Sequence, residues 1–570
     1  MSSPPSGSRA KAFGAFYTDP LIARFLVWWA LRTGRETIID PSFGGGVFLE
    51  EAAKRIQLMG GEINDQVYGV ELDADVHSRV SAELREALGV SPKNLILADF
   101  FEVAPSRLGP FDAVVGNPPF IRYQSFSGAS REQALRRALD QNVELSKLAS
   151  SWAAFLVHAV ALLKPGGRLA MVLPVELGHA AYARPLVDFL QRSFGTVTLL
   201  TFEKRLFVEL SQDTLLLLAE ARGEPFGGLL WQDLTDGEDL AVIQKDGRLP
   251  LAGTRSIDLP ALATGKDKLA LHFISERAAD LYQELASSPS VKRLGDLAEA
   301  GIGYVTGANP FFHLSPAGAK ERDLSGALLK RAVFRGKALT GLSFDLKDWQ
   351  RAAARGDAGY LFAVEAEEAL TEAALAYIRA GEEEGVPGSY KCRTRSPWYR
   401  VPHVYLPDAF LTYMSGLRPR LVANEAGAVA PNTLHVVRLR PHAALSGRVL
   451  SGKALSALWQ TSLTCLSAEL EGHALGGGML KLEPSEAKRV MVPFPAANGE
   501  LVGLAEDWDA IVRRDGEDKA RRHANEVILE GVLGLSKGEC RLLRDAAEGL
   551  RSRRYRRGGR SGSVARPSRV

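Results

Sequence analysis

Four short apolar segments in the first 120 residues constrain the fold more than any other feature of the sequence. Each ends in a polar or glycine-rich turn, and helical patterns lie between them. This alternation is typical of a doubly wound α/β sheet with parallel strands. The four segments are residues 37–40, 67–71, 94–98 and 111–116. Further strands are expected at 168–174, 196–202 and 213–221, so the sheet domain is predicted to end near residue 225.

The fourth apolar segment runs directly into Asn117-Pro118-Pro119-Phe120. Two consecutive prolines fix φ and make the loop stiff. A loop at the carboxyl end of a strand is where an open α/β sheet places its ligands. The Asn117 side chain and the Pro118 carbonyl can each accept one N–H, while Phe120 can stack on a ring. The loop therefore suits a planar substrate with an exocyclic amino group, although a plain loop after a buried strand is the alternative.

A glycine-rich turn follows the first strand, and acidic residues follow the next two. Gly44, Gly45 and Gly46 allow the backbone to approach a ligand closely. The turn lacks the ending of a phosphate-binding P-loop and the GxGxxG pattern of dinucleotide-binding proteins. Glu71 ends the second strand, where an acid commonly hydrogen-bonds ribose hydroxyls. Each feature alone could be a turn or a solvated strand end, but with Asp99 in register the set favours a nucleotide-type site.

Composition limits the classes of partner. The net charge is +3, and residues 551–570 carry eight Arg and no acid, so the remainder is net negative. A nucleic-acid surface must therefore be a local cleft, aided by the tail unless that is only a solvated segment. The three cysteines are far apart, without metal-site spacing and never preceded by proline. We expect reduced thiols, no metal, no Pro-Cys nucleophile and a cytoplasmic protein without a membrane segment.

The residue composition changes along the chain and divides it into segments. An irregular α+β domain is expected where short apolar runs alternate with Gly, Pro and aromatic residues. The predicted segments are 1–12 disordered, 13–225 catalytic sheet domain, 226–289 connecting segment, 290–500 second domain, 501–550 helical extension and 551–570 Arg-rich disordered tail.

Several motifs in this order resemble the TaqI-like (gamma-order) DNA adenine-N6 methyltransferases, a likeness covering roughly residues 13–495. Phe16 to Pro20, with Tyr17 and Thr18, looks like the N-terminal cofactor motif. Asp40 to Gly46, with Pro41, Gly44 and Gly46, looks like the S-adenosylmethionine loop, although Ser42 replaces the usual Ala. The resemblance implies that Glu71 binds the ribose and that Asp99 and Phe100 bind the cofactor adenine. Asn117, Pro118 and Phe120 match the catalytic loop, with Asn117 also at the cofactor. Segments 303–309 and 477–484 resemble the ends of the family's target-recognition domain.

The resemblance implies a Rossmann-like methyltransferase domain followed by an α+β target-recognition domain. The implied activity is S-adenosylmethionine-dependent methylation of adenine N6 at a specific sequence in double-stranded DNA, with base flipping. A restriction-modification or phage-defence role implies a separate endonuclease or defence subunit beside a monomeric enzyme. Family geometry suggests a second aromatic against the flipped base, and Phe207 is the candidate unless it is ordinary core.

Two alternatives stay open. The same Asn-Pro-Pro loop serves methylation of ribosomal RNA and of release-factor glutamine, but residues 290–500 count against those enzymes. A non-catalytic DNA-binding subunit of a defence complex is disfavoured by the intact Gly44–Gly46, Asn117 and Phe120.

Overall fold

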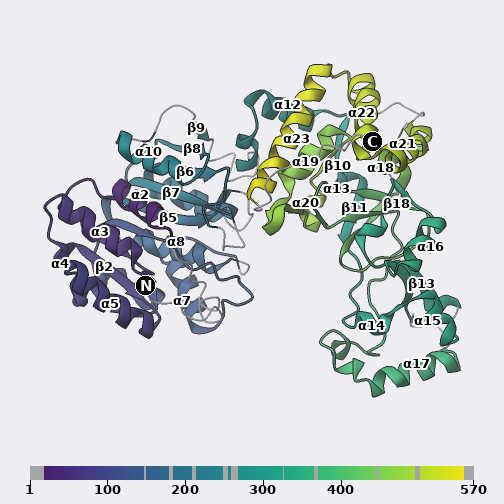
Figure 1. Cartoon of the computed structure of the whole chain (residues 1–570), viewed down its shortest axis with the longest axis horizontal. Helices are drawn as coiled ribbons and strands as arrows, with labels where there is room; N and C mark the ends of the chain where they lie inside the picture. The colour runs from purple at the N-terminus through teal and green to yellow at the C-terminus, as the bar shows by residue number, and fades with distance from the viewer. Residues whose placement is uncertain are drawn as a thin grey trace, which may run out of the picture. The chain divides into compact units, whose positions relative to one another are not determined.

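The computed structural model describes residues 18–557 except for short internal segments. These are 147–148, 179–183, 208–212, 248, 250–253, 258–267, 325, 365–369, 442, 446–447 and 495–500. The chain forms two compact units (Figure 1). Residues up to Phe273, together with Arg556 and Arg557 among the described residues, belong to the first, and Ile274–Tyr555 form the second. We call them the N-terminal unit and the C-terminal unit and describe each by itself.

The N-terminal unit is built on a nine-stranded sheet with the order β3-β2-β1-β4-β5-β7-β6-β8-β9. Strands β1 to β5 pair in parallel, whereas β7 lies antiparallel between β5 and β6. The expectation of a doubly wound parallel α/β sheet is confirmed for this half. The strands are β1 Ile38–Asp40, β2 Val67–Glu71, β3 Leu95–Leu97, β4 Phe111–Gly116, β5 Leu163–Pro174, β6 Phe194–Phe202, β7 Thr214–Arg222, β8 Gly228–Leu234 and β9 Arg255–Ile257.

Helices cover both faces of this sheet because neighbouring strand residues point to opposite sides. Ile38 packs in one core with α2, α3 and α5, while Ile39 packs in the other with α7, α8 and α9. The helices are α2 Pro20–Ala30, α3 Val47–Leu58, α4 Ile63–Gln66, α5 Ala74–Leu88, α6 Pro105–Leu108, α7 Gly128–Leu139, α8 Ser151–Ala161, α9 Arg184–Ser193 and α10 Glu238–Asp246.

The expected end of the sheet domain near residue 225 is wrong. β8 pairs in parallel with β6, and β9 pairs with β8, so the supposed connecting segment 226–289 contributes two strands. Trp231 of β8 is buried and donates its ring N–H to Thr201 at 3.0 Å. This run of apolar residues lies among turn residues, which hid its strand character.

The C-terminal unit contains several small sheets, as expected for an irregular α+β domain. The five-stranded sheet has the order β11-β19-β16-β18-β14, and two three-stranded sheets have the orders β12-β15-β13 and β17-β23-β22. The strands are β10 Val291–Arg293, β11 Ala298–Ile302, β12 His313–Leu314, β13 Leu329–Val333, β14 Ser343–Phe344, β15 Ala358–Phe362, β16 Ala409–Thr412, β17 Met414–Ser415, β18 Leu421–Asn424, β19 Leu434–Leu439, β20 Ala444–Leu445, β21 Arg448–Val449, β22 His473–Leu475, β23 Met479–Lys481 and β24 Met491–Pro493.

Short helices surround these sheets, and longer ones end the chain. They are α12 Glu276–Ser287, α13 Leu294–Leu297, α14 Asn309–Phe312, α15 Pro316–Glu321, α16 Leu346–Ala354, α17 Glu372–Glu383, α18 Gly452–Leu458, α19 Ser462–Glu471, α20 Pro484–Ala487, α21 Leu501–Asp515, α22 Glu517–Ala524 and α23 Lys537–Arg557. Across the described part of the chain, no helix combines the length and apolar character that a membrane span needs.

The prediction of a disordered tail at 551–570 is wrong at its start, because α23 continues to Arg557. Arg554 is 4% exposed and its guanidinium pairs with Glu469 at 2.8 Å. A run of arginines suggested a solvated segment. Arg554 instead binds a carboxylate and backbone carbonyls that lie far away in the sequence. Residues 1–17 and 558–570 lie outside the described residues, so the predicted N-terminal disorder stays a prediction.

Candidate active site

The site forms where the sheet order reverses. β1 lies between β2 and β4, and the chain leaves β1 and β4 toward opposite sides of the sheet. In open α/β sheets ligands bind at the carboxyl ends of the two strands at such a point. Asp40 ends β1, and Asn117 follows β4 directly. Gly116 allows the two strand ends to approach, since a Cβ there would lie 3.0 Å from the Asp40 Oδ1 atom.

Asn117 has one side-chain group fixed and the other free. Its Nδ2 donates to the Thr18 hydroxyl at 3.2 Å, which joins the loop to the residues before α2. Its Oδ1 is buried and has no hydrogen-bond partner. Buried polar atoms are almost always paired, so an orphaned acceptor marks a place for a donor from a ligand. Within the described part of the chain, no donor reaches the Pro118 carbonyl oxygen either.

The Asn-Pro-Pro-Phe loop is also tied to the start of α8. Ser151 donates its hydroxyl to the Pro119 carbonyl and accepts the Ile121 N–H at 2.9 Å. The Ser151 N–H donates to the Ile121 carbonyl at 3.0 Å. The prolines cannot donate hydrogen bonds themselves, so Ser151 supplies the contacts that position the loop. Ser151 belongs to no motif in the sequence, so its role could be found only in the structure.

The glycine-rich turn takes backbone conformations that favour glycine. Gly44 has φ +46° and Gly46 has φ +80°. A Cβ at Gly46 would also meet Val80 Cγ1 at 2.6 Å, so this glycine allows α3 and α5 to pack closely. At Gly44 the nearest atom to an added Cβ is the Ser42 carbonyl oxygen at 3.9 Å, which leaves the turn open for a ligand to approach.

Glu71 organises this turn. Its Oε2 accepts the Gly44 N–H at 2.9 Å, and its Oε1 accepts the N–H groups of Leu72 at 2.9 Å and Asp73 at 2.8 Å. The carboxylate is thus already held in place by backbone donors. Carboxylate oxygens have lone pairs to spare, so the expected ribose contact is compatible with these bonds. That contact stays a prediction.

Asp40 is a buried acid with an incomplete set of partners. It is 1% exposed, its Oδ1 accepts the Ser42 N–H at 3.0 Å, and its Oδ2 has no partner. Burial raises the pKa of Asp40 to about 8, the Ser42 hydrogen bond opposes this, and the nearby Glu71 charge adds to it. A cation beside Oδ2 would favour the ionised carboxylate. The orphaned acceptor of Asp40 therefore fits a cofactor that carries an ammonium group, and the orphaned acceptor of Asn117 is left for an N–H donor.

Asp99 and Phe100 follow β3. The Asp99 Oδ1 accepts the Phe101 N–H at 2.9 Å and caps a short 3₁₀ turn. Phe100 is 4% exposed and packs against Phe155 and His158, with ring centroids 4.6 and 4.5 Å apart. The turn is therefore well fixed, and adenine binding by this pair stays a prediction.

His158 is a buried residue that sequence reasoning missed. Its Nε2 lies 2.9 Å from the Val103 carbonyl and 3.2 Å from the Phe100 carbonyl. Burial lowers its pKa to about 4, so the neutral imidazole can donate to these carbonyls at physiological pH. Neither motif nor spacing could have revealed it, because its partners lie more than 50 residues away.

The two candidate stacking residues differ in exposure. Phe120 is half-buried and lies against both cores of the sheet. Phe207 is 8% exposed and belongs to the core that contains α2 and α3. Its packing is that of a core residue, the alternative considered for it, and its contact with a flipped base stays a prediction. Tyr17 lies outside the described residues.

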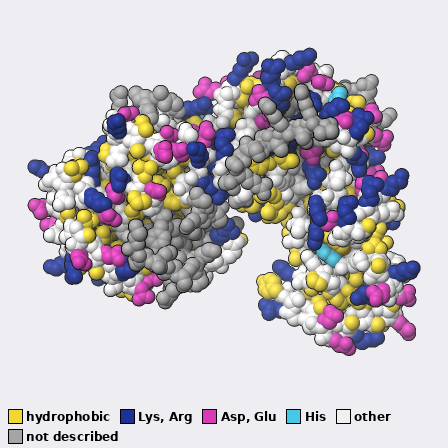
Figure 2. Space-filling model, viewed as in Figure 1, with side chains coloured by type: hydrophobic (Ala, Val, Ile, Leu, Met, Phe, Trp, Pro, Cys, Tyr) yellow, Lys and Arg dark blue, Asp and Glu magenta, His cyan; other side chains and the backbone are white. Residues whose placement is uncertain are grey.

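Among the residues that the structure describes, no group of three or more His, Cys, Asp and Glu side chains could hold a metal ion. In the view of Figure 2, basic and acidic side chains are interspersed over the N-terminal unit.

Comparisons with known proteins agree with the division of the chain. The family described as N-6 DNA Methylase matches residues 6–177, which include Asp40, Glu71 and the Asn117 loop. The family described as the C-terminal domain of the type II methyltransferase M.Eco57I matches residues 266–529. The second match begins close to the boundary between the two units at Phe273.

Individual relatives are distant in sequence, and the share of this chain that they match differs between them. The type II methyltransferase M.XamI of Xanthomonas campestris pv. amaranthicola is 23% identical over 86% of this chain and 86% of its own. A tRNA1(Val) (adenine(37)-N6)-methyltransferase of Trichodesmium erythraeum is 27% identical over 33% of this chain and 74% of its own.

A solved structure with little sequence identity shares this fold. The type ISP restriction-modification enzyme LlaGI, solved as a nuclease-deletion mutant with a DNA substrate mimic, matches 87% of this chain with a TM-score of 0.55 at 11% identity. This chain spans 55% of that structure's length, and the likeness concerns the fold alone. Taking the family matches and the relatives together, the chain is an adenine-specific DNA methyltransferase that uses S-adenosyl-L-methionine as its methyl donor.

Proposed function

We propose that this enzyme methylates adenine N6 at one specific sequence in duplex DNA, as the modification activity of a restriction-modification or phage-defence system. The single observation that carries the proposal is the Asn117 side chain, whose amide nitrogen is held by Thr18 while its buried oxygen is left without a partner. The type II relatives, such as M.XamI, support the setting.

The chemistry needs groups that act on a weak nucleophile. The adenine amino nitrogen delocalises its lone pair into the ring, and the cofactor supplies a methyl group on a cationic sulfur. Asn117 Oδ1 and the Pro118 carbonyl would each accept one N–H of the amine and favour tetrahedral geometry at nitrogen. Ser151 holds the loop so that both acceptors are positioned before the base arrives. Preorganised acceptors of this kind supply most of the rate enhancement.

Cofactor binding would use the groups around the strand ends. Asp40 Oδ2 is an unpaired acceptor at the end of β1 that would meet the cofactor's ammonium group, and Gly44 and Gly46 open the backbone above α3. Asn117 would border the cofactor without holding it, because its Oδ1 is kept for the amine. Glu71 would hold the ribose, with Asp99 and Phe100 at the adenine. We assign Thr18, and Tyr17 beside it, to the same site through the Asn117 contact and the motif they share.

A paired adenine is inaccessible to Asn117, so the base must leave the duplex. Phe120 is half-buried at the end of the loop and can cover one face of the extruded base. Sequence choice must come from other side chains, since the motifs of the N-terminal unit all serve cofactor and base. We assign it to residues 290–500 of the C-terminal unit, because groove readout needs side chains that reach base edges.

We further propose that the enzyme acts as a cytoplasmic monomer and that a separate endonuclease or defence subunit cuts unmodified DNA. Light scattering on the purified protein tests the monomer. RNA is the second candidate substrate, because the tRNA methyltransferase relative matches a third of this chain. That match spans only 191 residues, so it cannot include the whole C-terminal unit, and the presence of this unit argues for DNA.

Tritiated methyl transfer to duplex DNA, ribosomal RNA, tRNA and release factor tests the proposed substrate. We expect label in DNA alone, and none with the Asn117→Ala variant. Methylation-sensitive long-read sequencing of DNA from an expressing strain should then show one motif with methylated adenine. Label in RNA or release factor with unlabelled DNA would contradict the proposal, as would methylation without sequence preference.

A further inference from the structure

The C-terminal unit carries a hollow of about 780 Å³ formed by three separate segments. They are the turn at Gly336–Lys337, the strand and loop from Thr412 to Arg420, and the turn at Asn432–Leu434, with Glu517 at the border. We call this the 412–420 hollow.

Polar and apolar groups that are free to meet a ligand stand side by side in this hollow. Asn432 is exposed, and its side chain makes no hydrogen bond within the described part of the chain. Met414 and Leu417 are 47% and 64% exposed, so both apolar side chains are accessible to a ligand. An amide that can pair with a base edge, beside apolar groups that can meet a thymine methyl, is what reading DNA in a groove requires.

The charge of the hollow is complementary to a polyanion. Lys337, Arg418 and Arg420 line it against one acid, Glu517. Lys337 shares the Asp357 carboxylate with Arg335 and Arg355, and the side chains of all three cations are more than half exposed. The single Asp357 carboxylate therefore faces three cations. Arg418 and Arg420 each have an acid of their own, Asp518 and Glu517, so the region keeps a net positive charge.

The loop that carries Met414 and Leu417 is firmly held. Arg554 of α23 donates to the carbonyls of Gly416 at 2.9 Å and Leu417 at 3.2 Å, and also to that of Gly478. Tyr555 donates its hydroxyl to the Gly416 carbonyl at 2.7 Å. A loop of exposed apolar residues fixed by a buried guanidinium suits readout, which requires side chains in defined positions.

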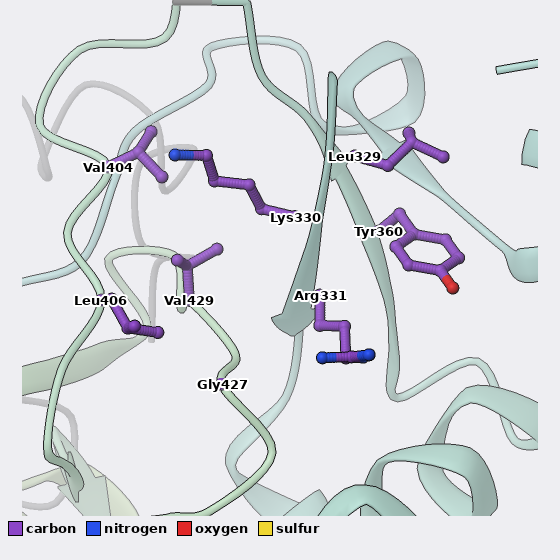
Figure 3. A pocket seen from close by; sticks show the side chains of 8 residues that line it. All are labelled: Leu329, Lys330, Arg331, Tyr360, Val404, Leu406, Gly427 and Val429. Carbon is purple, nitrogen blue, oxygen red and sulfur yellow. The ribbon is translucent and has the colours of Figure 1, made fainter. Parts of the chain in front are cut away.

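A smaller hollow of about 340 Å³ lies beside β13 and β15 and is a weaker candidate (Figure 3). Its Arg331 already donates to the Ala426 carbonyl at 3.2 Å and lies over the Trp349 ring. The arginine that lines it is therefore engaged within the protein.

We propose that the 412–420 hollow is the surface on which the C-terminal unit contacts duplex DNA, with Lys337 at a phosphate and Asn432 at a base edge. The inference rests on the proposed function, since it names where that enzyme reads its DNA. It also makes Arg554 a positioning residue, because it acts through the loop and not on the DNA.

The test measures DNA binding by fluorescence anisotropy at several salt concentrations. One duplex carries the motif found by long-read sequencing, and the other carries the motif scrambled. The full chain is compared with Lys337→Ala and Asn432→Ala. Matched controls are Lys347→Ala on α16 and Gln283→Ala on α12, which remove the same groups from exposed positions outside the hollow. Cofactor affinity and thermal unfolding of each variant establish that it is folded.

The two hollow variants should differ from each other. Lys337→Ala should weaken binding to both duplexes alike and reduce the slope of log affinity against log salt by about one. Asn432→Ala should lower the preference for the motif roughly 5- to 150-fold and leave the salt slope unchanged. The controls should match the wild type.

Binding by both hollow variants that is indistinguishable from the controls would overturn the assignment, provided that the wild type methylates DNA at its motif. A wild type that methylates no DNA would instead overturn the proposed function itself. The two failures are therefore separable in one set of measurements.

Discussion

Replacing Asp40 by Asn should make the N-terminal unit more stable, and the gain should grow with pH. The folded carboxyl has its pKa raised to about 8 by burial, against a model-compound value of 3.8. As pH rises between these values, the unfolded chain loses its proton while the folded chain keeps it, so the free energy of unfolding falls. The slope is about 1.4 kcal/mol per pH unit for one proton. Above pH 8 both states are ionised and the loss is complete.

The size of the effect follows from the pH window. From pH 5 to pH 8 the wild type should lose at most about 4 kcal/mol that the neutral Asn variant does not lose. Each kcal/mol shifts Tm by roughly 2–4 °C in a unit of this size. Thermal unfolding of wild type and Asp40→Asn at intervals across this range measures the gap. The transition that S-adenosyl-L-methionine raises in the wild type identifies the N-terminal unit.

Asp112→Asn is the matched control. Burial opposes ionisation of Asp112, but Lys164 at 2.7 Å and the Thr37 hydrogen bonds lower its pKa overall. Its contribution is lost only as pH falls through that lowered pKa, so between pH 5 and 8 the Asp112→Asn deficit should be constant. A Tm gap for Asp40→Asn that is equally flat would refute the reasoning that Asp40 is protonated in the free protein.

Three other substitutions test the site. Asn117→Ala should lower single-turnover methyl transfer by orders of magnitude with cofactor affinity nearly unchanged, because its acceptor matters as the amine changes geometry; near-normal rates would exclude the proposed role. Glu71→Ala should weaken cofactor binding by roughly 1.5–3 kcal/mol in calorimetry, through both the ribose contact and the Gly44 N–H that it holds, and unchanged affinity would reject the assignment. Phe120→Ala should slow methylation more on a paired adenine than on a mismatched one, with altered 2-aminopurine fluorescence, whereas Phe207→Ala will show neither effect if Phe207 is only core.

The catalytic half could be predicted because its signals are local. Each of the first strands is a short apolar run, and each ends at a residue type that stops it, as Asn117 and the two prolines stop β4. Asp40, Glu71 and Asn117 were expected at strand ends, and the sheet order brings two of these ends, those of β1 and β4, to the switch point. The roles of these residues stay predictions.

What could not be predicted depends on partners far away in the sequence. The Asn117 bond to Thr18 spans 99 residues, and the buried state of His158 depends on carbonyls 55 and 58 residues earlier. Arg554 pairs with Glu469, which lies 85 residues earlier. This pairing is invisible in the local sequence, where the many arginines suggested a disordered tail. Strand β8 was not predicted for another reason. Turn residues flank it in the sequence, and its pairing with β6 is what makes it a strand.

The hydrogen bonds from Arg554 to the loop that carries Met414 and Leu417 have a consequence for synthesis of the protein. Arg554 lies 138 residues after Gly416 and 76 after Gly478 along the chain. During translation the loop is therefore made long before the residue that holds it. A chain cut between β24 and Arg554, by a nonsense mutation or by proteolysis, would keep every motif of the N-terminal unit. We expect such a fragment to keep the groups proposed for methyl transfer but to lose the contacts that hold the loop, so its preference for one DNA sequence should weaken while methyl transfer persists.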